Sequence, residues 1–227
     1  ARLRSPEGCP WDREQTYESL LPYLLEESYE YIQAVREDDP DHMYDELGDV
    51  LLQVVFHAEI GRQHGDFDIL DVTTAICHKM MERHSHIFGG ASADTPEEVA
   101  QNWEAIKRRQ RGITTAQQAM RDVSKGLSPT MRAGKVQQKA ARAGYVFPEA
   151  EDALQAVRNA AVKVGETMNR KRDPEKALGE MLFDAVNVTR LCGKSADIAL
   201  NEATDRFIDR FSTAETATNA AKNAPNT

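Results

Sequence analysis

The chain has 227 residues, enough for one large domain or two small ones with a buried core. Its 28 basic and 37 acidic residues give a formal net charge of −9. A protein this acidic is poorly suited to neutralising a nucleic-acid backbone or an anionic membrane, so we expect neither as a partner. If the ligand is itself an anion, something other than the net charge of the protein must attract it.

The most apolar stretch, residues 47–60, does not predict a membrane span. Asp49, Gln53, His57 and Glu59 interrupt it, whereas a membrane helix needs roughly 18 largely apolar residues in a row. The first residues carry no apolar run of the kind found in a secretory signal. The three cysteines lie far apart and form no Cys-x-x-Cys pair, as is typical of reduced thiols. These features favour a soluble, cytoplasmic protein.

Apolar residues recur at three- and four-residue spacing between scarce glycines and prolines, which predicts an all-α fold. The first helix is predicted to begin after Asp12, or later with Thr16 and Ser19 as caps, and to end before Asp38. The apolar stripe of this helix consists of Leu21, Leu24, Leu25, Ser28, Ile32 and Val35.

A second helix is predicted from Pro40 to Gly61 or Gly65, antiparallel to the first. Further helices are predicted over residues 68–83 and 96–111. The apolar side of the second helix carries Leu47, Val50, Leu51, Val54, Val55 and Ala58. Glu46 and Asp49 border this side, so packing of the second helix is expected to bring them toward its partner.

The chain is predicted to contain two copies of one helical unit. The segment 48–52 resembles 179–183, an alignment that also places Val55 on Val186, and 79–83 resembles 206–210. The two units are predicted at residues 1–111 and 131–211, joined by a polar linker at 112–130 that is broken by glycine and proline. Residues 212–227 are predicted to form a flexible tail.

Four carboxylates stand in pairs on the first two predicted helices. Glu27 and Glu30, like Glu46 and Asp49, are three residues apart and so lie about 60° apart on their helix. Facing pairs would form a cage for a cation, with Glu26 beside it. A solvated acidic face is the alternative interpretation for any single glutamate. Four carboxylates gathered without a cation would repel one another, and a hard cation removes that cost.

All-oxygen ligands favour Mg²⁺, Mn²⁺ or Ca²⁺ over Zn²⁺, and Mg²⁺ is our first choice, with Mn²⁺ as a substitute. A helical di-iron site would use Glu-x-x-His pairs, and the sequence contains none. Carboxylate-bound magnesium keeps positions open for water and for substrate phosphates. Such a site would supply the positive charge that an acidic protein lacks.

Several motifs, taken in order, resemble the MazG family of nucleoside triphosphate pyrophosphohydrolases. The first are Gly-Cys-Pro-Trp-Asp at 8–12, Glu-Glu-x-x-Glu at 26–30 and Glu-Leu-Gly-Asp at 46–49. The likeness continues through Leu-Leu-Gln-Val-Val-Phe-His at 51–57, Arg-His-x-His-x-Phe at 83–88 and Trp-Glu-x-Ile-Lys at 103–107. It covers nearly the whole chain, and the ordered combination is highly specific.

This resemblance implies an all-α fold of two tandem MazG units, assembled as a homodimer whose subunits share their active bundles. It also implies Mg²⁺-dependent hydrolysis of nucleoside triphosphates to monophosphates and pyrophosphate. Carried over residue by residue, the metal ligands would be Glu27, Glu30, Glu46 and Asp49.

The sequence departs from the family pattern in two places. The His-Pro-His of the family is His-Ser-His at 84–86, which keeps both imidazoles. The second unit has lost the acidic motif: Asn159, Ala160 and Lys163 stand near the first acidic positions, and Ala177 and Glu180 near the second. We therefore expect the second unit to be structural or to mediate dimerisation.

The remaining candidates concern the reaction itself. Glu26 could position or deprotonate the attacking water, or only support the metal ligands. Lys79, Arg83 and Lys107 could hold phosphates, and Trp103 could stack on a base or pack in the core. A catalytically silent helical dimer that binds nucleotides or a protein is the alternative function; only an enzyme would release pyrophosphate.

Overall fold

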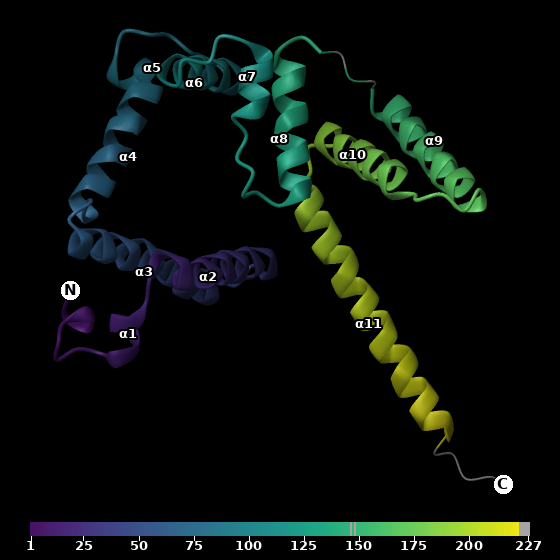
Figure 1. The fold of residues 1–227 in the computed structure, drawn as a ribbon, viewed down its shortest axis with the longest axis horizontal. Helices are drawn as coiled ribbons and strands as arrows, with labels where there is room; N and C mark the ends of the chain where they lie inside the picture. The colour runs from purple at the N-terminus through teal and green to yellow at the C-terminus, as the bar shows by residue number, and fades with distance from the viewer. Residues whose placement is uncertain (146, 148, 223–227) are drawn as a thin grey trace. The chain divides into compact units, whose positions relative to one another are not determined.

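A computed structural model of the chain describes residues 1–145, 147 and 149–222, and every regular element within them is a helix (Figure 1). The predicted all-α fold is therefore confirmed. The chain divides into two compact units, Ala1–Ile106 and Lys107–Thr227. No described helix combines the length and the apolar character that a bilayer crossing requires. Cys9, Cys77 and Cys192 are free thiols.

The first unit begins with a short 3₁₀ helix and is otherwise built from α-helices. These elements are η1 (Arg2–Arg4), α1 (Pro10–Glu14), α2 (Tyr17–Glu37), α3 (Pro40–His64), α4 (Ile69–Arg83) and α5 (Ser85–Phe88). Helix α6 (Pro96–Gln110) crosses the boundary between the units.

The second unit differs from the sequence-based expectation at both of its ends. Its helices are α7 (Ala116–Arg121), α8 (Pro129–Arg142), α9 (Ala150–Asn169), α10 (Glu175–Leu191) and α11 (Ala196–Lys222). The segment 112–130, predicted to be a linker, holds α7 and the start of α8 and belongs to this unit. Residues 212–222 of the predicted tail continue α11, which fits their alanine content because alanine is the strongest helix former. The rest of the predicted tail, 223–227, lies outside the described residues.

Side-chain caps explain where α2 begins. The Ser19 N–H donates to Thr16 Oγ1 (3.2 Å) and the Thr16 N–H donates to Ser19 Oγ (2.9 Å), a reciprocal capping box. The chain therefore breaks after the short α1, and the later of the two predicted starts is confirmed. Helix α2 ends before Asp38, as the sequence predicted, and Asp38 itself adopts the left-handed conformation (φ 54°).

The next helices are bounded in the same local way. Asp39 Oδ1 accepts from the N–H groups of Asp41 and His42, and Pro40 occupies the first position of α3. Gly65, at φ 78°, ends α3, because this backbone conformation is easily reached only without a Cβ. Asp68 caps α4.

The seam between α2 and α3 is narrower than the apolar stripes that the sequence shows. Leu20, Phe56 and Ile60 form its buried core, with Tyr17 packed against them. The predicted stripes lie largely outside this seam: Leu21, Leu25, Ile32, Val35, Leu47, Leu51, Val54 and Val55 are all exposed in the chain. The expectation that Leu47 and Val54 face the partner helix is therefore wrong. Each helix is apolar over more than one arc, and the arc that packs in the seam is not the one that carries the predicted stripe.

The second unit pairs α9 with α10 and adds α8 against α10. The fully buried Gln137 on α8 donates from Nε2 to the Phe183 carbonyl on α10 (2.8 Å). Val186 is buried on α10, whereas Val55, with which it aligned in sequence, is 44% exposed on α3. Thr130 Oγ1 donates to Asp197 Oδ1 (2.7 Å), which ties the start of α11 to α8.

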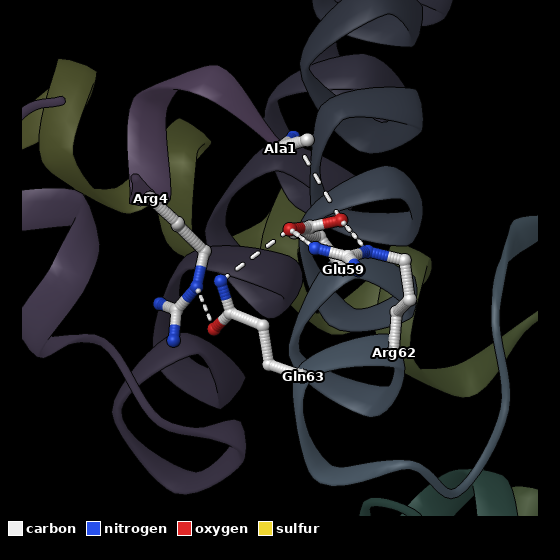
Figure 2. Close-up of polar contacts among 5 residues, drawn as sticks. All are labelled: Ala1, Arg4, Glu59, Arg62 and Gln63. Atoms are coloured by element: carbon white, nitrogen blue, oxygen red, sulfur yellow. Dashed lines mark hydrogen bonds and ion pairs between the residues drawn. The ribbon is translucent and has the colours of Figure 1, made fainter. Parts of the chain in front are cut away.

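The N-terminal segment is fastened to α3 by polar contacts (Figure 2). Arg4 Nε donates to Gln63 Oε1 (2.9 Å), and its guanidinium lies over the Phe56 ring, 5.5 Å from the centroid. Next to it, Arg62 donates two hydrogen bonds of 2.8 Å to Glu59. The Ala1 amino group lies 3.7 Å from Glu59. The hydrogen bonds from Arg62 lower the pKa of Glu59 despite the opposing effect of burial.

A carboxyl whose pKa falls on folding stabilises the fold above its ordinary pKa of 4.5, and the effect is lost as the pH falls through the lower value of the folded protein. Glu59→Gln should lower the melting temperature at pH 7 by about 1 to 4 °C, as expected for an ion pair that remains in contact with water through the exposed Arg62. Calorimetry against pH checks this, with Glu14→Gln on α1 as control. A deficit that persisted at strongly acidic pH would contradict it.

Candidate functional site

Three of the predicted carboxylates converge between α2 and α3. One oxygen each from Glu27, Glu46 and Asp49 lies within 4.8 Å of the other two. Throughout the described part of the chain, no other set of three or more acidic, histidine or cysteine side chains is gathered this closely. The pairing of helices predicted from spacing therefore occurs, with one ligand candidate from α2 and two from α3.

The packing of the seam explains this convergence. Glu27 lies seven residues after the buried Leu20 and seven before the buried Ala34, so all three project from nearly the same side of α2. Asp49 and Glu46 lie one and two helical turns before the buried Gln53 on α3. The carboxylates are thus aligned along the edge of the seam by the residues that close it.

The electrostatics of the cluster are those of an uncompensated acidic site. Burial raises the pKa of Glu27 above its ordinary value, and the negative charges of Asp49, Glu30, Glu46 and Glu26 raise it further. The structure therefore brings the four other predicted acids within electrostatic range of Glu27. Glu26 and Glu30 are exposed and stand beside the three-oxygen group without being part of it.

The donor set fits a hard divalent cation. Two oxygens bound to one Mg²⁺ at about 2.1 Å are at most about 4.2 Å apart, close to the spacing found here. All three donors are carboxylates, which suits Mg²⁺ or Mn²⁺ better than Zn²⁺. Burial and the neighbouring negative charges both raise the pKa of Glu27, and a bound cation would oppose both effects.

His42 is a neighbour of the site that the sequence analysis missed. Its Nε2 lies 2.9 Å from Glu46 Oε1, one turn along α3, and its Nδ1 lies 3.7 Å from Glu37. The four-residue spacing of His42 and Glu46 was the available signal, since residues four apart on a helix are neighbours. The imidazole holds the Glu46 carboxylate on the edge of the cluster.

The predicted phosphate and base contacts lie on α4 and α6. Lys79 is exposed, Arg83 is half-buried, and Trp103 packs with its ring nearly perpendicular to His84, 4.8 Å between centroids. Arg83 Nε, His86 Nδ1 and Trp103 Nε1 are buried with no hydrogen-bond partner among the described residues. Unsatisfied nitrogens of this kind suit an anion. Lys107 follows Trp103 by one turn of α6 and falls in the second unit.

Within the first unit, Lys79, Arg83 and Trp103 lie apart from the carboxylates. Asp49 lies 15 residues before the end of α3, about 22 Å along its axis. Helix α4 meets α3 beyond that end and leads away from the α2–α3 pair (Figure 1). No described contact joins Lys79, Arg83 or Trp103 to the three carboxylates.

The second unit also contains a packed helix pair, α9 and α10, on which the residues aligned with the acidic motif lie. Asn159, Ala160 and Lys163 lie on α9, and Ala177 and Glu180 on α10. Ala160 is buried where α9 packs, while Lys163 and Glu180 are exposed. No ligand cluster comparable to the first occurs in the described residues of this unit.

Comparisons with known proteins point in one direction. The model of the MazG nucleotide pyrophosphohydrolase domain matches residues 15–88, a stretch that includes all five acids, Lys79 and Arg83. The nucleoside triphosphate pyrophosphohydrolase of Escherichia coli K12 is 38% identical over 222 residues, covering 92% of this chain and 82% of that protein.

Two further relatives carry similar names. The nucleoside triphosphate pyrophosphohydrolase/pyrophosphatase MazG of Thermotoga maritima is 39% identical over 210 residues, covering 92% of this chain and 80% of that protein. The nucleoside triphosphate pyrophosphohydrolase of Mycobacterium tuberculosis is 32% identical over 192 residues, covering 84% and 55% of the two chains.

Because the carboxylates repel one another, their effect on the stability of the fold can be measured. In metal-free buffer, Glu27→Gln should raise the melting temperature, because it removes one of several mutually repelling charges. Saturating Mg²⁺ should stabilise the wild type and leave the variant nearly unchanged, since only a folded-state ligand shifts the unfolding equilibrium. Differential scanning calorimetry with and without chelator measures both effects. Glu180→Gln is the control, and a variant less stable than wild type in chelator would contradict the assignment.

Proposed function

The chain belongs to the MazG nucleotide pyrophosphohydrolase family, a family of hydrolases, and we propose that it converts nucleoside triphosphates to nucleoside monophosphates and pyrophosphate. Because this reaction is not coupled to other work, its role would be to remove triphosphates from the cytoplasmic nucleotide pool. The observation that carries the proposal is the convergence of Glu27, Glu46 and Asp49 within the stretch that the family model matches.

Mg²⁺ is the proposed cofactor, with Mn²⁺ as a substitute. Glu27, Glu46 and Asp49 would hold it, and Glu30, whose charge already acts on Glu27, would complete the set. When bound, the metal would neutralise phosphate charge and polarise the phosphorus–oxygen bond under attack. His42 would keep the Glu46 carboxylate directed at the cluster.

Glu26 is the proposed base. Its exposed carboxylate lies next to Glu27 in sequence, beside the metal ligands and open to solvent water. It would orient a water molecule and accept its proton as the water oxygen bonds to phosphorus. In this step the bond between the attacked phosphorus and the oxygen that bridges the α and β phosphoryl groups breaks. The bridging oxygen leaves with the electron pair of that bond.

Lys79, Arg83 and Lys107 would hold the phosphates that the metal does not reach, with Trp103 beside them. The buried, unpaired nitrogens of Arg83 and Trp103 support an anion at this place. The metal would neutralise part of the phosphate charge and the basic side chains the rest, so that an acidic protein could bind a polyanion.

A homodimer is the proposed assembly. Exposed apolar residues form continuous stripes on both α2 and α3, a surface that a monomer in water rarely leaves open. One chain also keeps its carboxylates apart from Arg83 and Trp103. A second copy packed on the stripes would bury them in a four-helix bundle and could supply the missing groups.

The metal proposal is tested with Asp49→Ala. Loss of a ligand oxygen should lower kcat by about 100-fold or more while helicity is retained, because the metal no longer stabilises the transition state. Pyrophosphate release from ATP, GTP, CTP and UTP is the measurement, with circular dichroism as the folding control. Glu180→Ala, the residual acid of the second unit, should keep the wild-type rate. Wild-type turnover by Asp49→Ala would refute the site.

The dimer proposal is tested at Leu51, which is 61% exposed in the stripe on α3. Leu51→Glu should weaken the dimer by about 100-fold or more, because association would then bury an unpaired carboxylate. Leu51→Ala, which remains apolar, should stay largely dimeric. Sedimentation equilibrium gives the mass, and pyrophosphate release should fall together with the dimer fraction. A monomeric wild type with full activity would overturn the proposal.

A further inference from the structure

We propose that Trp11 and Tyr23 form the platform on which the nucleobase of the substrate stacks. This inference rests on the proposed function and adds a residue pair to it. The Trp11 and Tyr23 rings meet edge to face, with centroids 5.8 Å apart and planes at 78°. Both remain open to solvent, Trp11 at 50% and Tyr23 at 38% exposure. An exposed, preformed aromatic corner is a surface on which a planar base can stack.

The platform stands next to the carboxylate cluster. Tyr23 precedes Glu27 by four residues on α2, so the two side chains lie about one turn apart along the axis and about 40° apart around it. Glu27 in turn belongs to the three-oxygen group. A base on Tyr23 would therefore place its ribose and first phosphate toward the proposed metal site, across a gap of roughly one helical turn.

The position of Tyr23 also separates it from the proposed dimer surface. At about 100° per residue, Tyr23 lies roughly 160° from Leu25 and 180° from Ile32 around α2. Its ring is thus on the acidic side of the helix, opposite the apolar stripe. A second copy that covers the stripe would leave this side of α2 open.

Trp11 is held in place by the N-terminal segment. Arg4 is hydrogen-bonded to Gln63 on α3. Its Nη1 also donates to the carbonyl of Asp12 and to the carbonyl of Gln15, the latter at 3.0 Å. Gln15 Nε2 donates to the Trp11 carbonyl (3.0 Å). The bonds from Arg4 fasten the middle of α1 and the residue that follows it, so the backbone that carries the indole is already in place when a base binds.

Trp103, the other tryptophan, is less suited to stacking a base. Its Nε1 is buried and its ring packs against His84, whereas half of the Trp11 surface is open. Trp103 is better suited to supporting the anion-binding nitrogens around Arg83. The two tryptophans would then serve opposite ends of the nucleotide.

The test compares ligands with and without a base, using the full chain and Mg²⁺. Tyr23→Leu and Trp11→Leu should each raise KM for ATP by about 5- to 150-fold, the range expected for one lost stacking contact. Inorganic tripolyphosphate carries the phosphates without a base, so its inhibition constant should stay at the wild-type value. Tyr145→Leu is the matched control, because Tyr145 is also exposed and meets Phe147 edge to face at 4.8 Å.

A spectroscopic measurement supports the kinetic one. The chain has two tryptophans, so Trp103→Phe leaves Trp11 as the only indole emitter. ATP should change its fluorescence, and tripolyphosphate should not. Unchanged KM for ATP in both leucine variants would overturn the platform. Equal weakening of ATP and tripolyphosphate would also overturn it, by showing that the pair only supports the fold.

Failure of the proposed function would give a different result. A wild type that releases no pyrophosphate would refute the hydrolase reaction, and calorimetric titration of the same variants with ATP and tripolyphosphate would still decide the platform. Selective loss of ATP binding in Tyr23→Leu would support the platform. Equal affinities of wild type and Tyr23→Leu for ATP, or the absence of ATP binding by wild type, would refute it.

Discussion

The packing of α2 against α3 holds several like charges together along one helix seam, and the proposed site depends on this arrangement. Packing of Leu20 and Ile60 draws α2 and α3 together, and the same packing brings Glu27, Glu46 and Asp49 within 4.8 Å of one another. The raised pKa of Glu27 expresses the cost of that arrangement. In our proposal, a bound divalent cation would offset this cost and would also supply a positive centre for a polyanionic substrate. Stability and chemistry are thus coupled through one cluster.

The seam also determines which surfaces remain available for other contacts. Because α2 and α3 use one arc each for their mutual packing, the stripes that contain Leu25 and Leu51 remain exposed. The acidic side of α2 carries Tyr23 next to the cluster, in contact with Trp11. In our proposals, one helix pair therefore provides a metal site and a neighbouring base platform on one arc and a dimer surface on another, and these functions use different side chains.

Local sequence pattern was sufficient for much of this description. The caps at Thr16, Asp39 and Asp68 involve partners within three residues, so the limits of α2, α3 and α4 could be inferred from a linear sequence. The spacing of Glu46 and Asp49 is likewise a property of one helix. The order of the acidic motif and the Gly-Cys-Pro-Trp-Asp segment identified the family, which relatives covering most of the chain then confirmed.

Tertiary packing alone decided which arc of each helix faces its partner. Both α2 and α3 are apolar over more than one arc, so a helical wheel could not distinguish the seam at Leu20 from the exposed stripe at Leu25. Trp11 meets Tyr23 from a segment that Arg4 fastens, and the partner of Arg4 on α3, Gln63, is 59 residues away in sequence. Contacts over such separations leave no periodic trace in the sequence, because they arise only when distant segments meet in the fold.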